Sequence, residues 1–94
     1  MEAPKSNSGY NQYGFEQSTL KLLIVQDIQK QVGKNIRTLQ VKRRLTQDVF
    51  ADLSGLHRAH VSEIERGESN VTIQTLEIVA DTLEVRIRDL VRDL

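Results

Sequence analysis

The chain has 94 residues, a formal net charge of zero and no cysteine. This length fits one small domain, whose core must be well packed or completed by a partner chain. The lack of cysteine excludes disulfides and thiolate metal sites. The longest apolar run, Leu22 to Val25, has four residues, against roughly 20 for a membrane span. Because the N-terminus also lacks a signal-peptide pattern, we expect a cytoplasmic protein.

The first 17 residues differ in composition from the rest of the chain. They contain the only proline and two of the glycines, together with several Ser, Asn and Gln residues. Such a segment buries too little apolar surface to offset its ordering entropy, so we predict a flexible tail over residues 1–17 and an ordered domain over 18–94. The side chains of Tyr10, Tyr13 and Phe15 are either scattered tail aromatics or a docking segment.

A stripe of apolar residues follows this tail. Ser18 or Thr19 suits the N-cap of a helix. Apolar residues then recur at steps of four, four, four, four and three, at Leu20, Ile24, Ile28, Val32, Ile36 and Leu39. This spacing places them on one face of a helix, which we predict from about residue 19 to residue 43.

Two features leave alternatives open in this region. Gly33 weakens a helix interior by about 1 kcal/mol, so the helix is either continuous or broken near residues 30–33. The branched residues between positions 20 and 25 are also compatible with a short β-strand.

Basic residues are concentrated at the end of this predicted helix. Residues 30–44 include no acidic residue and six basic ones, Lys30, Lys34, Arg37, Lys42, Arg43 and Arg44. Residues 45–94 hold five basic and ten acidic residues. Since salt confines the field of a charge to about 10 Å, a chain without net charge can still present a cationic face to phosphates. We expect such a face here; the alternative is a solvated helix face.

Residues 46–66 have the pattern of a helix-turn-helix. Counted from Gln47, Ala51 is fifth, where two helices cross and only a small side chain fits. Gly55 is ninth, where the turn needs a positive φ. Val61 is fifteenth and faces back to the first helix, with apolar neighbours at suitable spacing in Phe50, Leu56 and Ile64. A motif of this kind delivers its second helix to the major groove of DNA.

The boundaries of the two motif helices follow from their ends. Thr46 caps a helix that runs to about Leu53, and Asp48 lies favourably near its positive end. The second helix runs from about Arg58 to Glu65 and stops at Gly67.

Two further helices complete the predicted fold. After a loop at residues 68–70, Thr72 caps a helix whose shared apolar face holds Ile73, Leu76, Ala80 and Leu83. A short last helix begins near Ile87 and carries its apolar residues at i, i+3, i+4 and i+7, namely Ile87, Leu90, Val91 and Leu94. The fold class is a compact all-α bundle of five helices, or six if the first one is broken.

The last stripe also predicts a dimer. One small bundle does not easily bury it together with the face of the preceding helix, so we expect Ile87, Leu90, Val91 and Leu94 to pair with the same surface of a second chain around a two-fold axis. That symmetry places two recognition helices about 34 Å apart and predicts a near-palindromic binding site.

From Val32 to Leu90 the chain resembles the Xre/Cro-type helix-turn-helix family of bacterial and phage repressors. The residues that carry the resemblance are Gly33, Ile36, Leu45-Thr46-Gln47, Phe50-Ala51, Gly55-Leu56, Val61-Ser62, Ile64-Glu65-Arg66-Gly67, Leu76, Ala80 and Leu83. The resemblance implies a lambda-repressor-like bundle. It also implies a transcriptional regulator that binds double-stranded DNA sequence-specifically as a homodimer.

Within that family, residues 55–83 look most like the controller proteins of restriction–modification systems. Those proteins often open the recognition helix with His-Arg, as at His57 and Arg58, and have Asn followed by Val or Ile and Thr or Ser, as at residues 70–72.

Three residues depart from the family pattern. The family commonly has an arginine at Gln40 that pairs with the glutamate matching Glu65, and Gln40 could hydrogen-bond that carboxylate instead. Arg44 stands where glycine is usual, so a left-handed φ would cost about 1 kcal/mol there. His60 replaces a frequent tyrosine and offers less aromatic surface.

Roles at the DNA follow from the entry of the recognition helix by its N-terminal turns. The candidates for reading base edges are His57, Arg58, Ala59, Ser62 and Glu63. Arg58 is the chief one, because a guanidinium bonds guanine O6 and N7 together. Ala59 suits a thymine methyl, and Glu63 suits a cytosine amine or an ion pair with Arg58. Backbone contacts are expected from Gln47, Thr46, His60, Arg43, Arg44, Asn70 and Thr72.

Other classes of function have weaker support in the sequence. His57, His60 and Glu63 share a helix face, but a zinc site there lacks a fourth ligand and would block the DNA face. No nucleophile–base constellation stands apart from residues that the fold explains, so we expect no enzyme and no cofactor. The main competitor is an antitoxin that binds its toxin through the N-terminal segment and uses DNA for autoregulation. RNA polymerase is another partner compatible with a regulator.

Overall fold

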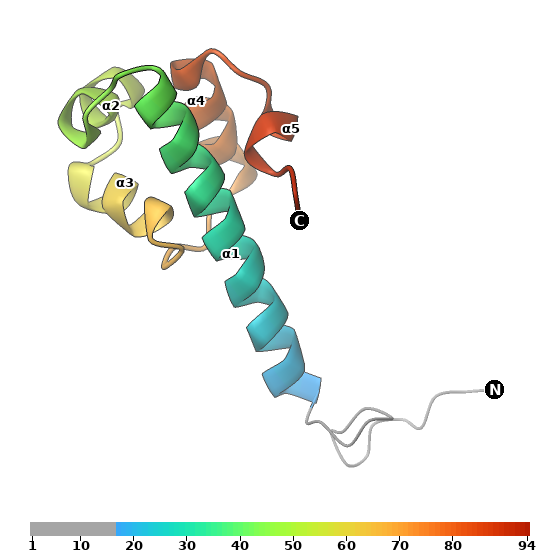
Figure 1. The fold of residues 1–94 in the computed structure, drawn as a ribbon. Coiled ribbons are helices and arrows are strands. Elements are labelled where there is room, and N and C mark those ends of the chain that lie inside the picture. Colours follow the sequence, from blue (N-terminus) through green and yellow to red (C-terminus); the bar gives the residue numbers. More distant parts are fainter. Residues whose placement is uncertain (1–16) are drawn as a thin grey trace.

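The computed structural model describes residues 17–94, and these residues form five helices and no strand (Figure 1). The helices are α1 (Gln17–Lys42), α2 (Gln47–Ser54), α3 (Arg58–Glu65), α4 (Ile73–Leu83) and α5 (Ile87–Leu90). The predicted all-α fold with five helices is confirmed for this part of the chain. The predicted tail lies outside the described residues, apart from Gln17.

Helix α1 is continuous over 26 residues, without the break near residues 30–33 and without a strand at 20–25. It begins at Gln17, so the prediction of Ser18 or Thr19 as its N-cap is wrong, and both residues lie inside its first turn. Gly33 lies where α1 crosses the end of α3. A Cβ there would be 2.3 Å from the carbonyl oxygen of Ile64, so the glycine permits a close approach of the two helices.

The core takes buried side chains from all five helices, which are Val32, Ile36, Phe50, Ala51, Val61, Ile64, Val79, Ala80, Leu83 and Leu90. The predicted core positions of the helix-turn-helix are confirmed, with Leu56 half-buried at the edge. The predicted place of Ile73 on the packed face of its helix is wrong. Ile73 is the first residue of α4, and its side chain is exposed.

The apolar stripe of α1 enters this core only over its second half. The predicted stripe lies on one continuous helix. Val32 and Ile36 are buried in the core, whereas Ile24 and Ile28 are exposed, so the bundle covers only part of the stripe. The reason is length. A helix of 26 residues is about 39 Å long at 1.5 Å per residue, and the next longest helix, α4, has 11 residues. The N-terminal half of α1 therefore projects beyond the bundle (Figure 1).

The ends of the helix-turn-helix helices form as their sequences predict. The Thr46 hydroxyl accepts a hydrogen bond from the Val49 amide at 3.1 Å and caps α2. Gly55 ends α2 with a φ of 77°, in the left-handed region that glycine takes without steric cost. The Thr72 hydroxyl caps α4 in the same way, by accepting from the Thr75 amide.

The end of the chain differs from its prediction. Helix α5 stops at Leu90, so Leu94 does not extend one helical stripe. The Asn35 side-chain amide donates to the carbonyl oxygens of Leu90 at 3.0 Å and Arg92 at 2.9 Å. These bonds attach the last residues to α1. They also give the Leu90 carbonyl oxygen, at the end of α5, a hydrogen-bond donor that the helix itself does not provide.

No helix within residues 17–94 has the length and hydropathy required to cross a membrane.

Candidate nucleic-acid interface

Helix α3 is held by one face and exposes the other. Val61 and Ile64 lie in the core, which fixes the helix against α1 and α2. The predicted base-reading residues His57, Arg58, Ala59 and Glu63 are all exposed, and Ser62 is half-buried. The structure thus brings the predicted residues together on the N-terminal turns and outer face of a rigidly packed helix.

Arg58 is positioned by the neighbouring helix. Its Nε lies 2.6 Å from Oδ1 of Asp48, which is in the first turn of α2. The alternative of an ion pair with Glu63 is therefore replaced by this contact. Both side chains of the pair remain open to solvent, at 65% and 73% exposure. Since the contact uses Nε, the two terminal Nη groups remain as a fork that suits O6 and N7 of guanine.

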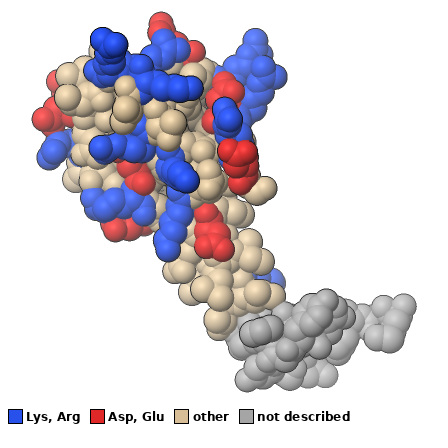
Figure 2. Space-filling model, in the orientation of Figure 1, with Lys and Arg blue, Asp and Glu red and all other residues tan. Residues whose placement is uncertain are grey.

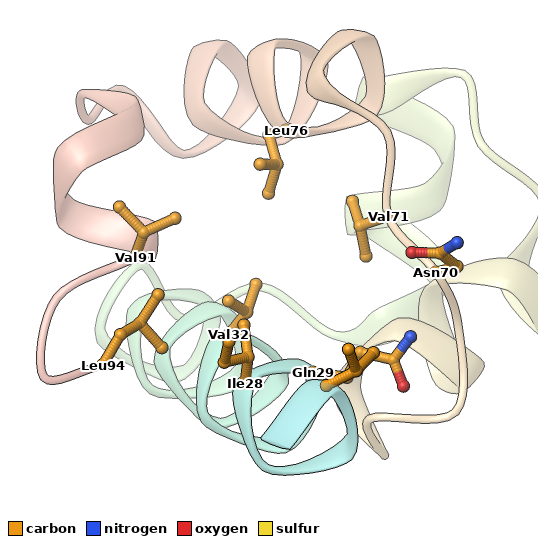
Figure 3. Close-up of a pocket in the computed structure, with 9 residues that line it drawn as sticks. Ile28, Gln29, Val32, Asn70, Val71, Leu76, Val91 and Leu94 are labelled. Atoms are coloured by element: carbon orange, nitrogen blue, oxygen red, sulfur yellow. The ribbon is translucent and has the colours of Figure 1, made fainter. Parts of the chain in front are cut away.

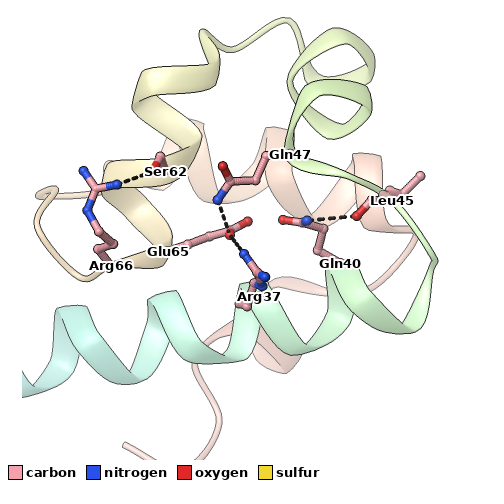
Figure 4. A network of polar contacts seen from close by, with 7 residues as sticks. All are labelled: Arg37, Gln40, Leu45, Gln47, Ser62, Glu65 and Arg66. Atoms are coloured by element: carbon pink, nitrogen blue, oxygen red, sulfur yellow. Dashed lines mark hydrogen bonds and ion pairs between the residues drawn. The ribbon is translucent and has the colours of Figure 1, made fainter.

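A buried polar network joins α1, α2 and α3 behind this surface (Figure 4). The Glu65 side chain, only 4% exposed, accepts from Nε2 of Gln47 at 3.0 Å and from Nη1 of Arg37 at 3.3 Å. Gln40 donates instead to the carbonyl oxygen of Leu45 at 2.9 Å. The Gln40–Glu65 hydrogen bond considered from the sequence does not form, and Arg37, one turn earlier on α1, supplies the cation for Glu65.

Gln47 retains a donor for a phosphate. One N–H of its amide is directed to Glu65, and the amide group carries two. It is also the first residue of α2, where unpaired backbone N–H groups and the helix dipole favour an anion. Thr46 uses its hydroxyl oxygen as an acceptor for the cap and keeps its O–H as a donor. Both residues remain candidates for contact with the DNA backbone.

The basic run is divided among different surfaces. Arg43 pairs with Glu84 at 2.7 Å, beside the α4–α5 turn, and Arg37 pairs with Glu65. Lys42 borders a hollow that also includes Asp89. Figure 2 shows basic and acidic side chains interspersed over the bundle. Neighbouring acidic groups thus offset the charges of Arg37 and Arg43, and the cationic face expected from the sequence stays a prediction.

The remaining candidates for backbone contact are dispersed. Arg44 has a φ of 57°, so the strained left-handed conformation considered from the sequence is present. Nε2 of His60 lies 3.4 Å from the Ser69 hydroxyl, while Asn70 is exposed and borders a groove next to α1. Thr72 is occupied by its cap.

Arg66 is a functional candidate that the sequence did not single out. It follows α3 directly, its Nη1 donates to the Ser62 hydroxyl, and its Nη2 donates to Glu68 at 3.0 Å. The hydrogen bond with Arg66 lowers the pKa of the Glu68 carboxyl. Arg66 thus orients the hydroxyl of one predicted base-reading residue. Its position four residues after Ser62, at the end of the same helix, was the available signal.

The predicted dimerisation residues fall into two groups. Leu90 is fully buried within the monomer, so it belongs to the core and the prediction that it meets a second chain is corrected. Ile87 and Leu94 are exposed, and Val91 is half-buried. Within residues 17–94, no group of three or more His, Asp or Glu side chains is arranged to hold a metal ion.

Comparison with known proteins places the motif in a family. The helix-turn-helix family matches residues 29–90 of this chain. The chain is 38% identical over 61 residues to the control protein C.SmaI of Serratia marcescens, a match that covers 65% of this chain and 73% of that protein.

Solved structures give the same result. The restriction–modification controller protein C.AhdI from Aeromonas hydrophila superposes with a TM-score of 0.64 at 36% identity, over 68% of this chain and 96% of that one. The restriction–modification controller protein C.Esp1396I, solved as a tetramer in complex with its natural 35 base-pair operator, superposes with a TM-score of 0.60 at 29% identity, over 69% of this chain and 96% of that one.

Proposed function

This chain belongs to the helix-turn-helix family, and we propose that it is a transcriptional regulator that binds double-stranded DNA sequence-specifically as a homodimer, in the manner of a restriction–modification controller. The observation that carries the proposal is the outer face of α3. There Arg58, braced by Asp48, is exposed beside His57 and Ala59 on a helix whose other face is fixed in the core. That arrangement suits direct reading of the major groove.

Dimerisation follows from the exposed apolar residues at the end of the chain. Ile87, Val91 and Leu94 have surface left for a second copy. A two-fold pair spaced for DNA holds its recognition helices about 34 Å apart, so we propose a near-palindromic operator. A regulator acts where the DNA is, which we propose to be the cytoplasm. We propose no catalytic activity and no cofactor.

Selection of bound duplexes from a random pool tests this function. The expected result is one enriched site with two related half-sites, whose centres are about 10 base pairs or a multiple apart. A pool that remains random after repeated rounds, at a salt concentration where the protein still binds DNA, contradicts the proposal.

The antitoxin alternative has less support. The relatives described above, most of whose length this chain covers, are restriction–modification controllers. The two functions differ in one measurable respect. An antitoxin co-purifies with the product of a neighbouring gene, whereas a stand-alone controller binds its operator without a protein partner other than itself.

A further inference from the structure

The projecting half of α1 is the most apolar surface segment of the described chain without an assigned role. Five large side chains within residues 17–28 are between 41% and 56% exposed, namely Leu22, Leu23, Ile24, Val25 and Ile28. Figure 2 shows this part of the molecule as largely uncharged. It lies before residue 29, where the family match begins. The segment is therefore additional to the DNA-binding unit.

Two of these five residues, Ile24 and Ile28, continue the core stripe of α1. Ile24 and Ile28 precede the buried residues Val32 and Ile36 at helical steps of four. A helix repeats its faces with this period, so the same stripe that packs inside the bundle runs on past its end. A contiguous apolar surface of this kind marks an interaction site.

An apolar groove lies where the projecting segment joins the bundle (Figure 3). Val25 and Ile28 line it from α1, Leu76 from α4, and Val91 and Leu94 from the end of the chain. Its volume is about 220 Å³. An apolar cavity of roughly 150 Å³ binds benzene, so this groove has room for a large apolar side chain. The groove makes the α1 stripe continuous with two of the residues proposed for dimerisation.

The charges of the segment favour a second copy as the partner. Residues 17–28 contain one basic residue, Lys21, and one acidic residue, Asp27. Two copies of a surface without net charge meet without like-charge repulsion, and a two-fold axis brings identical apolar patches together. We propose that the N-terminal half of α1 packs against the same segment of a second copy and extends the dimer surface of Val91 and Leu94. This inference rests on the homodimer in the proposed function.

The test compares two substitutions in the full chain by sedimentation equilibrium at micromolar concentration. Ile24→Glu places a charge on the stripe at an exposed position outside the core. Gln26→Glu places the same charge 200° away on the same helix, and Gln26 is also exposed. We expect the dissociation constant of the dimer to rise at least tenfold for Ile24→Glu and to stay unchanged for Gln26→Glu. Equal effects of the two substitutions, or a wild-type chain that remains monomeric, overturn the proposal.

A distance measurement identifies the contact directly. The chain has no cysteine, so Gln26→Cys provides one site for a spin label. Paired helices have axes 8–10 Å apart and a diameter of about 10–12 Å with side chains. Because Gln26 lies on the outer side of each helix, labels on two packed α1 segments should lie within about 35 Å. A dimer that shows only longer distances forms without α1, and overturns the proposal.

DNA binding separates this inference from the proposed function. We expect Ile24→Glu to keep wild-type affinity for random DNA and to lose affinity for the two-half-site operator. If Ile24→Glu dimerises normally and binds the operator normally, the α1 interface is wrong and the regulator stands. If the wild-type chain dimerises through α1 but prefers no DNA sequence, the regulator is wrong and the interface stands.

Discussion

Asp48 of α2 holds Arg58 of α3 by Nε, at 2.6 Å, on the side of the guanidinium away from its terminal fork. The side chain expected to read a base is thus linked to the first helix of the motif before DNA arrives. An exposed pair of this kind contributes about 0–1 kcal/mol to stability, so its main consequence is for the orientation of Arg58. A preoriented side chain loses less rotamer entropy on binding.

Removal of the Arg58 side chain should abolish discrimination at one base pair of each half-site. We expect Arg58→Ala to lose about 1–3 kcal/mol of preference for the selected base and to bind random DNA nearly as well as the wild type. Fluorescence anisotropy with single-base variants of the operator measures both quantities. Arg88→Ala, which removes an exposed arginine of α5, is the matched control. Equal weakening on operator and random duplexes would refute base reading by Arg58.

Asp48→Asn should weaken the same discrimination and leave the domain folded. The substitution removes the charge that holds Nε of Arg58 but keeps a polar side chain in the first turn of α2. We expect a partial loss of specificity at the Arg58 base pair and a stability lowered by only about 0.3–1 kcal/mol, because the Asp48 charge also favours the N-terminus of α2. In the Arg58→Ala background, Asp48→Asn should have no further effect on specificity. An additive loss in the double variant would show that Asp48 acts independently of Arg58.

Two glycine substitutions should destabilise the chain for different reasons. The Cβ of Gly33→Ala would lie 2.3 Å from the Ile64 carbonyl oxygen, so α1 and α3 must move apart. Overpacking of this kind costs about 1–3 kcal/mol. Gly55→Ala meets no atom within 4 Å but must keep a φ of 77°, at a cost of about 1 kcal/mol. Urea denaturation measures both. A stabilised Gly33→Ala variant would mean that the two helices are not in close contact.

The local signals in the sequence predicted the parts of the fold that depend on neighbouring residues. Thr46 and Thr72 cap the starts of α2 and α4 as expected, and Gly55 ends α2 as expected. A cap or a turn depends only on a few neighbouring residues, so the sequence predicts it well. The exposure of Ile24 was not predictable in the same way. A stripe shows which face of a helix is apolar, but the reach of the other helices decides how much of it is covered.

Contacts between residues that are distant in the sequence were also not predicted. The partner of Glu65 is Arg37 rather than Gln40, since the crossing of α1 and α3 determines which turn lies opposite the carboxylate. In the same way, Asp48 and Arg58 are ten positions apart and meet only because of the turn between α2 and α3. Both contacts help to position α3 and Arg58 in the candidate interface.

Salt should weaken operator binding steeply. Gln47 and the start of α2 are placed for phosphate contact, and the exposed side chains of Arg58 and Arg66 lie on α3 and directly after it. If a dimer neutralises about six phosphates, the logarithm of the binding constant should fall with a slope near −5 against the logarithm of salt concentration. Titrations at several potassium chloride concentrations give this slope. A slope near zero would exclude the phosphate contacts.

Asn35→Ala should loosen the end of the chain and weaken dimerisation. The Asn35 amide donates to the carbonyl oxygens of Leu90 and Arg92, and it alone ties this segment to α1 among the side-chain hydrogen bonds found for residues 17–94. Loss of the donor leaves the Leu90 carbonyl without that bond in a buried region, at a cost of about 1–3 kcal/mol.

The control for Asn35→Ala is Gln31→Ala. Gln31 donates to the Asn35 side-chain oxygen at 3.0 Å, and its removal leaves both bonds to the chain end in place. We therefore expect a smaller loss of stability for Gln31→Ala and no change in dimerisation. Hydrogen exchange at residues 90–94 should accelerate in Asn35→Ala alone. If residues 90–94 exchange at the wild-type rate in both variants, the hydrogen bonds from Asn35 to the Leu90 and Arg92 carbonyl oxygens do not hold the end of the chain.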